Sequence, residues 1–224
     1  RQIEVSVIVP AYNEEKTIKE VLEKVKHIDV PEKEIVIAND GSTDGTSEIL
    51  SALQDDIIKV INYDKNEGKG SVIRKALEFV TGDRVVIQDA DLEYDPNDIP
   101  KLLQAMDETG SDVVYGSRFL GEAHNIHFLN YMANKFLTML VNITYGSHLT
   151  DSCTCYKLFR KEVITDVDLK CDGFEVCHQI TADVLKKKKK LVEVPIWYQA
   201  RTITMGKKVK WWDLFTSTYT IIKF

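Results

Sequence analysis

The fold is decided by residues 5–42, which read VSVIVPAYNEEKTIKEVLEKVKHIDVPEKEIVIANDGS. A short β-branched run at residues 5–9 comes first, and residues 14–27 follow with apolar side chains at helical spacing. A second apolar run, at residues 35–38, ends in Asp40-Gly41-Ser42, where a turn and a helix cap are expected. Strand, helix and strand in this order predict the start of a layered sheet.

The alternation of strand and helix continues as far as residue 116. Helix patterns follow at residues 43–53, at 69–80 and from 95 onwards, and strand patterns at residues 57–61, 84–88 and 112–115. We therefore expect an α/β fold with a mixed, mainly parallel sheet and helices on both faces. Ligand-binding residues in such sheets lie beyond the carboxyl ends of the strands. Polar residues occupy these places here, namely Asn13, Asp40, Asp89, Asp91 and Arg118.

The second half of the chain is less regular. A long helix is expected over Phe128–Tyr145, with a polar stripe at Asn130, Asn134, Thr138 and Asn142. Its apolar side belongs either to the core or to a lipid-facing surface. Further patterns predict a helix at residues 175–186, a strand at 190–197 and an amphipathic C-terminal helix at 211–224. No linker divides the chain, so residues 1–224 are expected to form a single domain.

The composition excludes several classes of protein. Hydrophobic residues make up 44% of the chain and charged residues 29%, which is typical of a packed core and not of disorder. A formal net charge of -6 disfavours general nucleic-acid binding, which needs a basic surface. No segment approaches the ~20 apolar residues that span a bilayer, and no secretory signal is visible. We expect a cytoplasmic protein, soluble or peripheral on the cytoplasmic face of a membrane.

The four cysteines, Cys153, Cys155, Cys171 and Cys177, lie in the last third of the chain. The first two are separated by one residue, and no second close pair follows, so the spacing does not match a common zinc site. Reduced and largely buried thiols are the favoured interpretation, and a zinc site that also uses His178 is the alternative.

Two aspartates, Asp89 and Asp91, stand at the end of the fourth strand pattern. In an extended backbone, residues i and i+2 point to the same side, so their carboxylates repel one another unless a cation lies between them. Mg²⁺ and Mn²⁺ prefer oxygen ligands and also bind phosphate oxygens. The pair therefore predicts a divalent metal site for a phosphorylated ligand, with a solvated acidic turn as the alternative.

Other residues after the strands suit a nucleotide. Residues 10–14 (PAYNE) supply an aromatic ring and polar groups for a nucleobase, and Asp40 is placed to accept hydrogen bonds from a base or a ribose, although turn and cap roles explain these residues equally well. The run Gly68-Lys69-Gly70 lacks the spacing of a P-loop, and no G-x-G-x-x-G follows the first strand. ATP hydrolysis of the P-loop type and dinucleotide-dependent dehydrogenation are therefore disfavoured.

Several motifs together resemble glycosyltransferase family 2, and within it the branch of dolichyl-phosphate mannose and glucose synthases. The motifs are VIVPAYNE at residues 7–14, NDGSTD at 39–44, NEGKG at 66–70, QDADLEYDP at 88–96 and YGSRF at 115–119. Asp151, the run CYKLFR at residues 155–160 and the basic residues of 201–208 continue the resemblance, which covers nearly the whole chain.

The resemblance implies a GT-A fold, which is Rossmann-like, with inverting sugar transfer and a bound Mg²⁺ or Mn²⁺. It implies a nucleotide-sugar donor in residues 1–116, a polyprenyl or dolichyl phosphate acceptor in residues 117–206 and a membrane-proximal basic and aromatic tail in residues 207–224. The residues that it implies in donor binding are Pro10, Ala11, Tyr12, Asn13, Glu14, Asp40, Gly41, Ser42, Lys69, Asp89, Ala90 and Asp91, with Asp89 and Asp91 on the metal. Those that it implies in catalysis are Asp91, Arg118, Asp151, Arg201 and Lys207.

Three positions depart from this branch. Cys153, Gln179 and Met205 are uncharged where the branch often has an acidic residue, whereas Asp151 and Glu175 are retained. The departures fall in the half that is expected to bind the acceptor. They therefore bear on the substrate more than on the fold or the metal.

The acceptor decides whether the reaction needs a base. A phosphate monoester is already anionic at neutral pH, so it needs only cations such as Arg118, Arg201 and Lys207 to hold it near the donor. A sugar hydroxyl would need a carboxylate base, for which Asp151 and Glu175 are the candidates. A family 2 enzyme that glycosylates a hydroxyl is therefore one alternative, and a non-catalytic nucleotide-sugar-binding module is another.

The carboxyl end of the chain combines cations with aromatic rings. The cations are Lys207, Lys208 and Lys210, and the rings belong to Trp211, Trp212, Phe215, Tyr219 and Phe224. This combination suits the headgroup zone of a membrane, where each cation contributes about 1 kcal/mol near an anionic leaflet. Aromatic rings packed on the core, with solvated lysines, are the alternative.

Overall fold

The computed structural model describes residues 2–201 and 212–224. One sheet of seven strands runs through this part of the chain, in the order β3-β2-β1-β4-β6-β5-β7. The strands are β1 (Val5–Ala11), β2 (Lys33–Asn39), β3 (Ile58–Asn62), β4 (Arg84–Ile87), β5 (Val113–His124), β6 (Lys157–Arg160) and β7 (Leu191–Gln199). β6 is antiparallel to both of its neighbours, and the other pairs are parallel.

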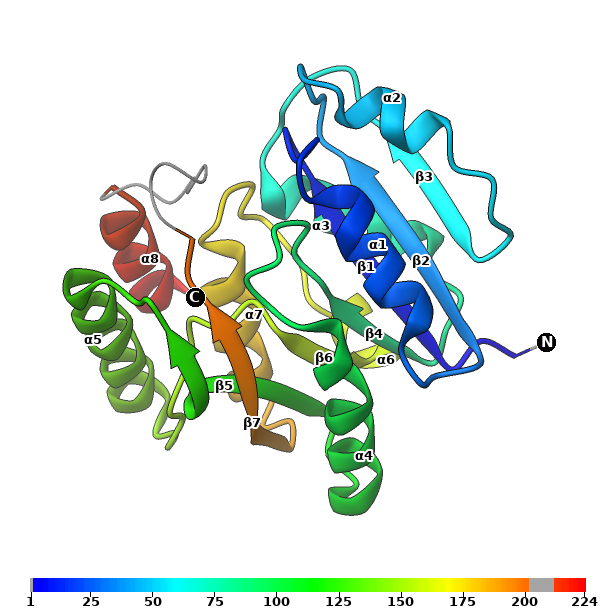
Figure 1. Ribbon diagram of the computed structural model, residues 1–224. Helices are drawn as coiled ribbons and strands as arrows, with labels where there is room; N and C mark the ends of the chain where they lie inside the picture. The colour runs from blue at the N-terminus through cyan, green and yellow to red at the C-terminus, as the bar shows by residue number, and fades with distance from the viewer. Residues whose placement is uncertain (1, 202–211) are drawn as a thin grey trace.

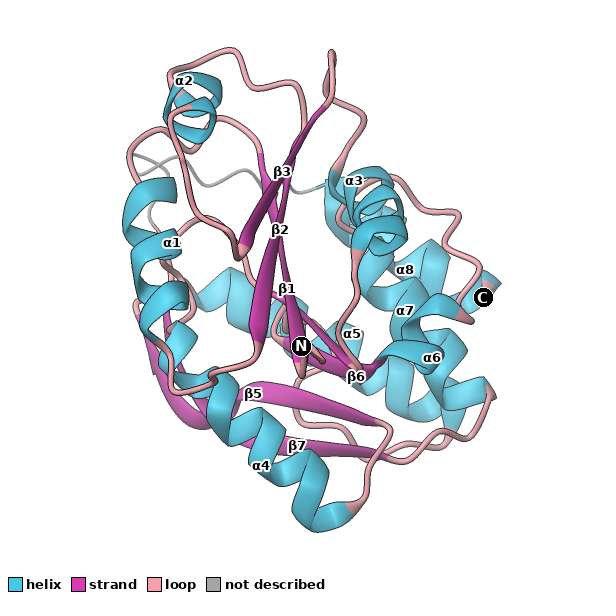
Figure 2. Cartoon of the chain, turned by 90° about the vertical axis from the view of Figure 1, so that its right-hand side faces the viewer, coloured by secondary structure: helices cyan, strands magenta, loops and turns pink. Residues whose placement is uncertain are grey.

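Helices cover both faces of the sheet (Figure 1, Figure 2). They are α1 (Ile18–His27), α2 (Thr46–Ser51), α3 (Lys69–Ala76), α4 (Ile99–Thr109), α5 (Phe128–Tyr145), α6 (Lys161–Thr165), α7 (Val176–Lys186) and α8 (Trp212–Lys223), with 3-10 turns η1 (Leu77–Phe79) and η2 (Pro96–Asp98). The expected α/β fold with a mixed, mainly parallel sheet is confirmed.

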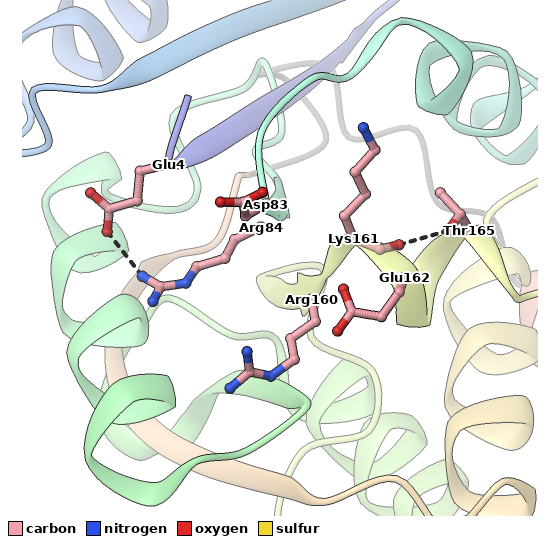
Figure 3. Close-up of a pocket in the computed structure, with 7 residues that line it drawn as sticks. All are labelled: Glu4, Asp83, Arg84, Arg160, Lys161, Glu162 and Thr165. Atoms are coloured by element: carbon pink, nitrogen blue, oxygen red, sulfur yellow. Dashed lines mark hydrogen bonds and ion pairs between the residues drawn. The ribbon is translucent and has the colours of Figure 1, made fainter. Parts of the chain in front are cut away.

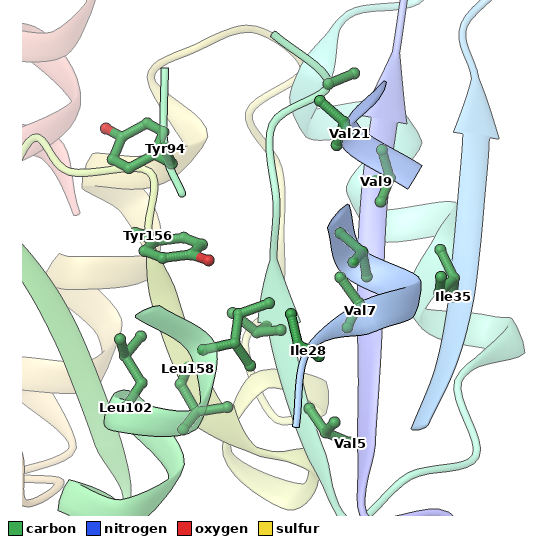
Figure 4. Close-up of a cluster of buried hydrophobic side chains, with 14 of the residues drawn as sticks. Val5, Val7, Val9, Val21, Ile28, Ile35, Tyr94, Leu102, Tyr156 and Leu158 are labelled. Atoms are coloured by element: carbon green, nitrogen blue, oxygen red, sulfur yellow. The ribbon is translucent and has the colours of Figure 1, made fainter. Parts of the chain in front are cut away.

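The core lies in two layers because strand side chains alternate between the faces of a sheet. On β1, Val5, Val7 and Val9 join the cluster under α1 and α4, which Figure 4 shows. Ile8 points the other way and joins the cluster under α3, α6 and α7. Burial on both faces explains why β1 is apolar at every position except the buried Ser6 and does not alternate with polar residues.

Some elements differ from the sequence expectation. The sequence does not reveal β6 and α6, because a strand of four residues that contains Lys157 and Arg160 has no recognisable apolar period. β5 runs on to His124, since its second part pairs with β7 after a register shift between Ser117 and Glu122. α1 and α2 begin three or four residues later than expected, because the residues before them form loops at the carboxyl edge of the sheet.

α5 and α8 lie side by side at one end of the molecule (Figure 1). They pack together through Leu137, Val141 and Ile221, and the Tyr145 hydroxyl donates a hydrogen bond to the Ile221 carbonyl (2.6 Å). Among residues 2–201 and 212–224, no helix has both the length and the apolar character needed to cross a bilayer.

The polar stripe of α5 faces the protein and most of its large apolar side chains face solvent. Thr138 is 3% exposed and shares a hydrogen bond with the Ser152 hydroxyl (3.2 Å), and the Asn142 amide binds both backbone groups of Leu149 (2.9 Å each). The exposed apolar residues are Phe128, Leu129, Tyr131, Met132, Phe136, Met139 and Ile143 on α5 and Trp212, Phe215, Tyr219 and Ile222 on α8. The alternative in which these side chains belong to the core is therefore wrong.

Gly41 offers a test of how closely the loops at the carboxyl edge are packed. Its φ is +64°, and a Cβ there would lie 2.5 Å from the Lys65 carbonyl carbon, whereas Gly110 has φ +60° with nothing within 4 Å. Gly110→Ala should lower the free energy of unfolding by about 1 kcal/mol, through backbone strain alone. Gly41→Ala should lower it by about 3 kcal/mol or more, because strain and a backbone clash add. Equal losses in urea denaturation would contradict the packing.

Candidate functional site

Three loops meet beyond the carboxyl ends of β1, β2 and β4. Asn13 has a left-handed backbone (φ 52°) and ties the first loop to the second, since its N–H donates to Ser42 Oγ (3.0 Å) and its Oδ1 accepts from the Thr43 N–H (2.8 Å). The Glu14 N–H donates to Thr46 Oγ1 (2.9 Å). The fold therefore brings together the residues that the sequence predicts around a nucleoside. Of these, Pro10, Tyr12, Asn13, Gly41 and Ser42 are partly exposed, and Ala11, Glu14 and Asp40 are buried.

The Asp40 carboxylate binds the loop that precedes α3. Oδ1 accepts from the Glu67 N–H (2.8 Å), and Oδ2 accepts from the Gly68 N–H (2.9 Å) and from Asn66 Nδ2 (3.0 Å). Asp40 is only 2% exposed. In this structure it shapes the loop that presents Lys69, and its contact with a base or ribose stays a prediction.

Lys69 reaches the first aspartate of the pair. Its Nζ lies 2.5 Å from Asp89 Oδ1, with the two side chains 10% and 14% exposed. Burial lowers the pKa of Lys69, but the Asp89 carboxylate, together with Cys155 and Cys177, outweighs burial and holds that pKa well above its usual value. Lys69 is therefore a fixed positive charge beside Asp89.

The second aspartate, Asp91, faces Arg201 at the end of β7. Arg201 Nη2 lies 2.8 Å from Asp91 Oδ2. Burial, together with repulsion from Asp89 and Glu93, raises the pKa of Asp91 to about 7 despite this partner. Negative charge is thus in excess at this point, which is the condition that a bound divalent cation would relieve.

Arg118 and Asp151 form a buried ion pair. Arg118 Nε and Nη2 donate to Asp151 Oδ2 and Oδ1, both at 2.7 Å, and the Arg118 backbone N–H adds a third bond to Oδ2 (3.1 Å). The Asp151 side chain is 0% exposed. Asp151 therefore holds Arg118 with both of its oxygens, and its candidate role as a base for a hydroxyl acceptor stays a prediction.

Glu93 is a residue of the site that the sequence reasoning missed. Its Oε1 accepts from the Arg201 backbone N–H (2.8 Å), and its Oε2 accepts from the Tyr198 hydroxyl (2.8 Å). Tyr198 in turn lies under the Arg118 guanidinium, 5.1 Å from ring centroid to Cζ. Glu93 thus joins the aspartate loop to the Arg118 pair. The available signal was its position two residues after Asp91, within the motif at residues 88–96.

Other predicted residues lie apart or outside the described residues. Lys207 and Met205, with Lys208, Lys210 and Trp211, lie outside residues 2–201 and 212–224. Glu175 Oε1 accepts from the Gly173 N–H (3.2 Å), and the Gln179 side chain binds the backbone of residues 168–171.

The cysteines do not form a metal site. All four are free thiols, with Cys177 buried and the others partly buried. Within the part of the chain that the structure describes, no three His, Cys, Asp or Glu side chains are grouped so as to hold a metal by themselves. The zinc alternative for the cysteines and His178 is therefore wrong. Asp89 and Asp91 still fit Mg²⁺ or Mn²⁺, because such ions are commonly bound by one or two carboxylates with water and substrate phosphates.

A charged cavity of about 600 Å³ lies at the opposite end of the central strands, away from the aspartate pair (Figure 3). It is lined by Glu4, Asp83, Arg84, Arg160, Lys161, Glu162 and Thr165. These residues adjoin the amino ends of β1 and β4 and the end of antiparallel β6. The cavity is therefore separate from the aspartate pair, and in Figure 3 the Glu4 carboxylate faces the Arg84 guanidinium (2.9 Å).

The sequence profile of "Glycosyl transferase family 2" matches residues 6–168. The chain belongs to glycosyl transferase family 2. It is 32% identical to "Dolichol-phosphate mannosyltransferase" of Pyrococcus furiosus over 205 residues, which are 89% of this chain and 57% of that protein. It is also 32% identical to "Low-salt glycan biosynthesis hexosyltransferase Agl6" of Haloferax volcanii, over 88% of this chain and 48% of that protein. The chain thus spans about half the length of these two relatives.

Solved glycosyltransferase structures share the fold. Glucosyl-3-phosphoglycerate synthase from Mycobacterium tuberculosis, in complex with Mn²⁺, UDP and phosphoglyceric acid, superposes with a TM-score of 0.73 at 19% identity, over 98% of this chain and 76% of that one. S. aureus TarS in complex with UDP-GlcNAc gives 0.67 at 22% identity, over 96% of this chain and 64% of that one. The GT-A fold that the sequence resemblance implies is confirmed.

Asp151→Asn separates a structural from a catalytic role for this carboxylate. We expect the free energy of unfolding to fall by about 3–5 kcal/mol, because the change leaves a buried guanidinium without its counter-ion. Glu20→Gln, which breaks the exposed Lys24–Glu20 pair, is the control and should cost less than about 1 kcal/mol. Urea denaturation provides the measurement. A variant of normal stability whose rate has lost one limb of its pH profile would instead support a role for Asp151 as a general base.

Proposed function

We propose that this protein is an inverting, metal-dependent glycosyltransferase that moves a sugar from a nucleotide-diphosphate donor, GDP-mannose or UDP-glucose or UDP-GlcNAc, to a polyprenyl or dolichyl phosphate. The observation that carries the proposal is the pair Asp89 and Asp91 at the carboxyl end of β4, each held by one internal cation. The pair lies beside the loops after β1 and β2, where the nucleoside would bind.

Asp89 and Asp91 would hold Mg²⁺ or Mn²⁺ on the donor diphosphate. When bound, the metal would act as a Lewis acid that stabilises charge on the departing nucleoside diphosphate. Lys69, which is paired with Asp89, would add a second positive charge beside that leaving group. The residues at 10–14 and 40–42 would orient the nucleoside from the adjacent loops.

The state of Asp151 favours a phosphate acceptor. Of the two carboxylates considered as a base for a hydroxyl acceptor, Asp151 is fully buried and its two oxygens are occupied by Arg118. A phosphate monoester is already a nucleophile at neutral pH and needs no base. The name of the Pyrococcus furiosus relative, a dolichol-phosphate mannosyltransferase, agrees with this choice.

The exposed apolar side chains of α5 and α8 would place the enzyme on its lipid substrate. Cations accompany the rings there, with Lys135 Nζ 4.1 Å from the Phe119 ring centroid and Lys223 Nζ 5.1 Å from that of Phe224. An apolar surface with cations at its rim suits the interface of an anionic membrane. We therefore propose peripheral attachment through these two helices, on the cytoplasmic face of a membrane.

A thermal-shift panel tests the donor and the metal together. The true nucleotide sugar with Mn²⁺ should raise Tm by about 5 °C or more, since a ligand at 100 times its Kd adds about 2.7 kcal/mol. Asp91→Asn should fold and lose this rise. Asp95→Asn, which changes a carboxylate that caps η2 in the same loop, should keep it. If Tm of Asp91→Asn rises as much as that of the wild type, Asp91 does not bind the metal.

Product analysis with the identified donor then tests the acceptor. Wild-type protein should glycosylate polyprenyl phosphate and not a free sugar hydroxyl, and Asp91→Asn should turn over about a hundredfold more slowly or worse. The Haloferax volcanii relative is named as a hexosyltransferase of glycan biosynthesis, so transfer to a sugar hydroxyl is the second candidate. If only the sugar hydroxyl is glycosylated, the proposed lipid-phosphate acceptor is wrong and the second candidate function takes its place.

Vesicle co-sedimentation tests the membrane surface. Met132→Glu combined with Ile222→Glu places charges on two exposed apolar positions, 49% and 66% exposed, and should weaken binding to anionic vesicles about tenfold or more. Phe79→Glu changes an exposed ring outside α5 and α8 and is the control. Binding that is equal in all three proteins would show that α5 and α8 are not the contact surface.

A further inference from the structure

Arg201 lies among three carboxylates. Its Nη2 is 2.8 Å from Asp91 Oδ2, its Nη1 is 3.2 and 3.3 Å from the two Glu14 oxygens, and its Nε is 3.8 Å from Glu93 Oε1. The Arg201 side chain is 11% exposed. The Arg201 N–H donates to Glu93 Oε1 and the Gln199 N–H to the Glu93 carbonyl (2.8 and 2.9 Å), so the backbone before this guanidinium is anchored.

The contacts of Arg201 are less complete than those of Arg118. Arg118 meets Asp151 through two bonds of 2.7 Å in a fork, which is the strongest arrangement for such a pair. Arg201 has one contact of similar length, to Asp91, and its buried Nε has no hydrogen-bond partner among residues 2–201 and 212–224. Its best bond is therefore made to one of the two proposed metal ligands.

Among the side chains that the structure describes around this point, acidic groups outnumber basic ones. Glu14, Asp89, Asp91 and Glu93 are each within ion-pair distance of Lys69 or Arg201. These six side chains are four carboxyl groups and two cations, so an added divalent ion would meet an acidic environment. A metal at Asp89 and Asp91 would also repel the guanidinium that now occupies Asp91.

We propose that Arg201 is the internal counter-ion of Asp91 and competes with the divalent metal for it, so that metal binding releases the guanidinium toward phosphate while Glu14 and Glu93 keep it beside the site. This inference rests on the metal site of the proposed function. In this inference, binding of the metal and release of Arg201 to contact phosphate occur together. It also assigns Glu14 and Glu93 as positioning residues for Arg201.

Binding of Mn²⁺ alone, measured by electron paramagnetic resonance without any nucleotide, tests the competition. Arg201→Gln should bind Mn²⁺ about tenfold more tightly than wild type, because a competing and repelling charge is gone. Arg84→Gln is the matched control, since it removes the same charge at the opposite end of β4 and should leave Mn²⁺ affinity unchanged. Unchanged or weaker binding in Arg201→Gln, or an equal gain in Arg84→Gln, would overturn the inference.

A second measurement needs no variant at position 201. In wild-type protein, Mg²⁺ without nucleotide should shift the Nε–Hε resonance of Arg201 and leave that of Arg118 in place, since only Arg201 shares an oxygen with the metal site. An Arg201 resonance that stays unmoved at saturating Mg²⁺ would overturn the competition independently.

Asp91→Asn distinguishes failure of this inference from failure of the proposed function. If wild type binds Mn²⁺, Asp91→Asn does not, and Arg201→Gln shows no gain, then the metal site stands and only the role of Arg201 falls. If wild type and Asp91→Asn bind Mn²⁺ equally or not at all, both the metal site and the competition fall.

Discussion

Repulsion between two buried carboxylates is the constraint around which the carboxyl edge of the sheet is organised. Asp89 and Asp91 follow the short strand β4 and are only 14% and 12% exposed, so little water separates their charges. Lys69 meets the first and Arg201 the second. These cations are the first residue of α3 and a residue just after β7, so compensating one local charge pair ties distant parts of the chain to β4.

The two arginines of the site differ in how completely they are paired with carboxylates. Arg118 lies in a closed fork with Asp151, and this pair supports the register-shifted part of β5 against the loop before β6. Arg201 is shared among several carboxylates and has no such fork. A buried cation with one complete partner is a structural element, whereas one with several incomplete partners can change partners at lower cost. Glu93 and Tyr198 connect the two regions.

The proposed membrane surface is a consequence of the hydrogen bonds that the backbone of one loop requires. The stretch that follows α5 has backbone groups that must be hydrogen-bonded, and Asn142 and Thr138 on α5 supply the partners. Satisfying them turns the polar stripe inward and leaves residues such as Met132 and Phe136 exposed. Amphipathicity therefore set the two sides of the helix but did not decide which side faces the protein.

The sequence by itself determined the α/β order of elements, the family and the place of Asp89 and Asp91, because strand runs such as residues 5–9 and the motif at 88–96 are local patterns of short range. It could not determine β6, whose four residues gain their strand form only between β4 and β5. It also left the partners of Asp151, Glu93 and Arg201 undecided. Contacts such as Arg201 with Glu14, which are 187 residues apart in the chain, follow from the closing of the whole sheet and not from any periodicity. Local patterns specify elements and charges, and only tertiary packing specifies which charges meet.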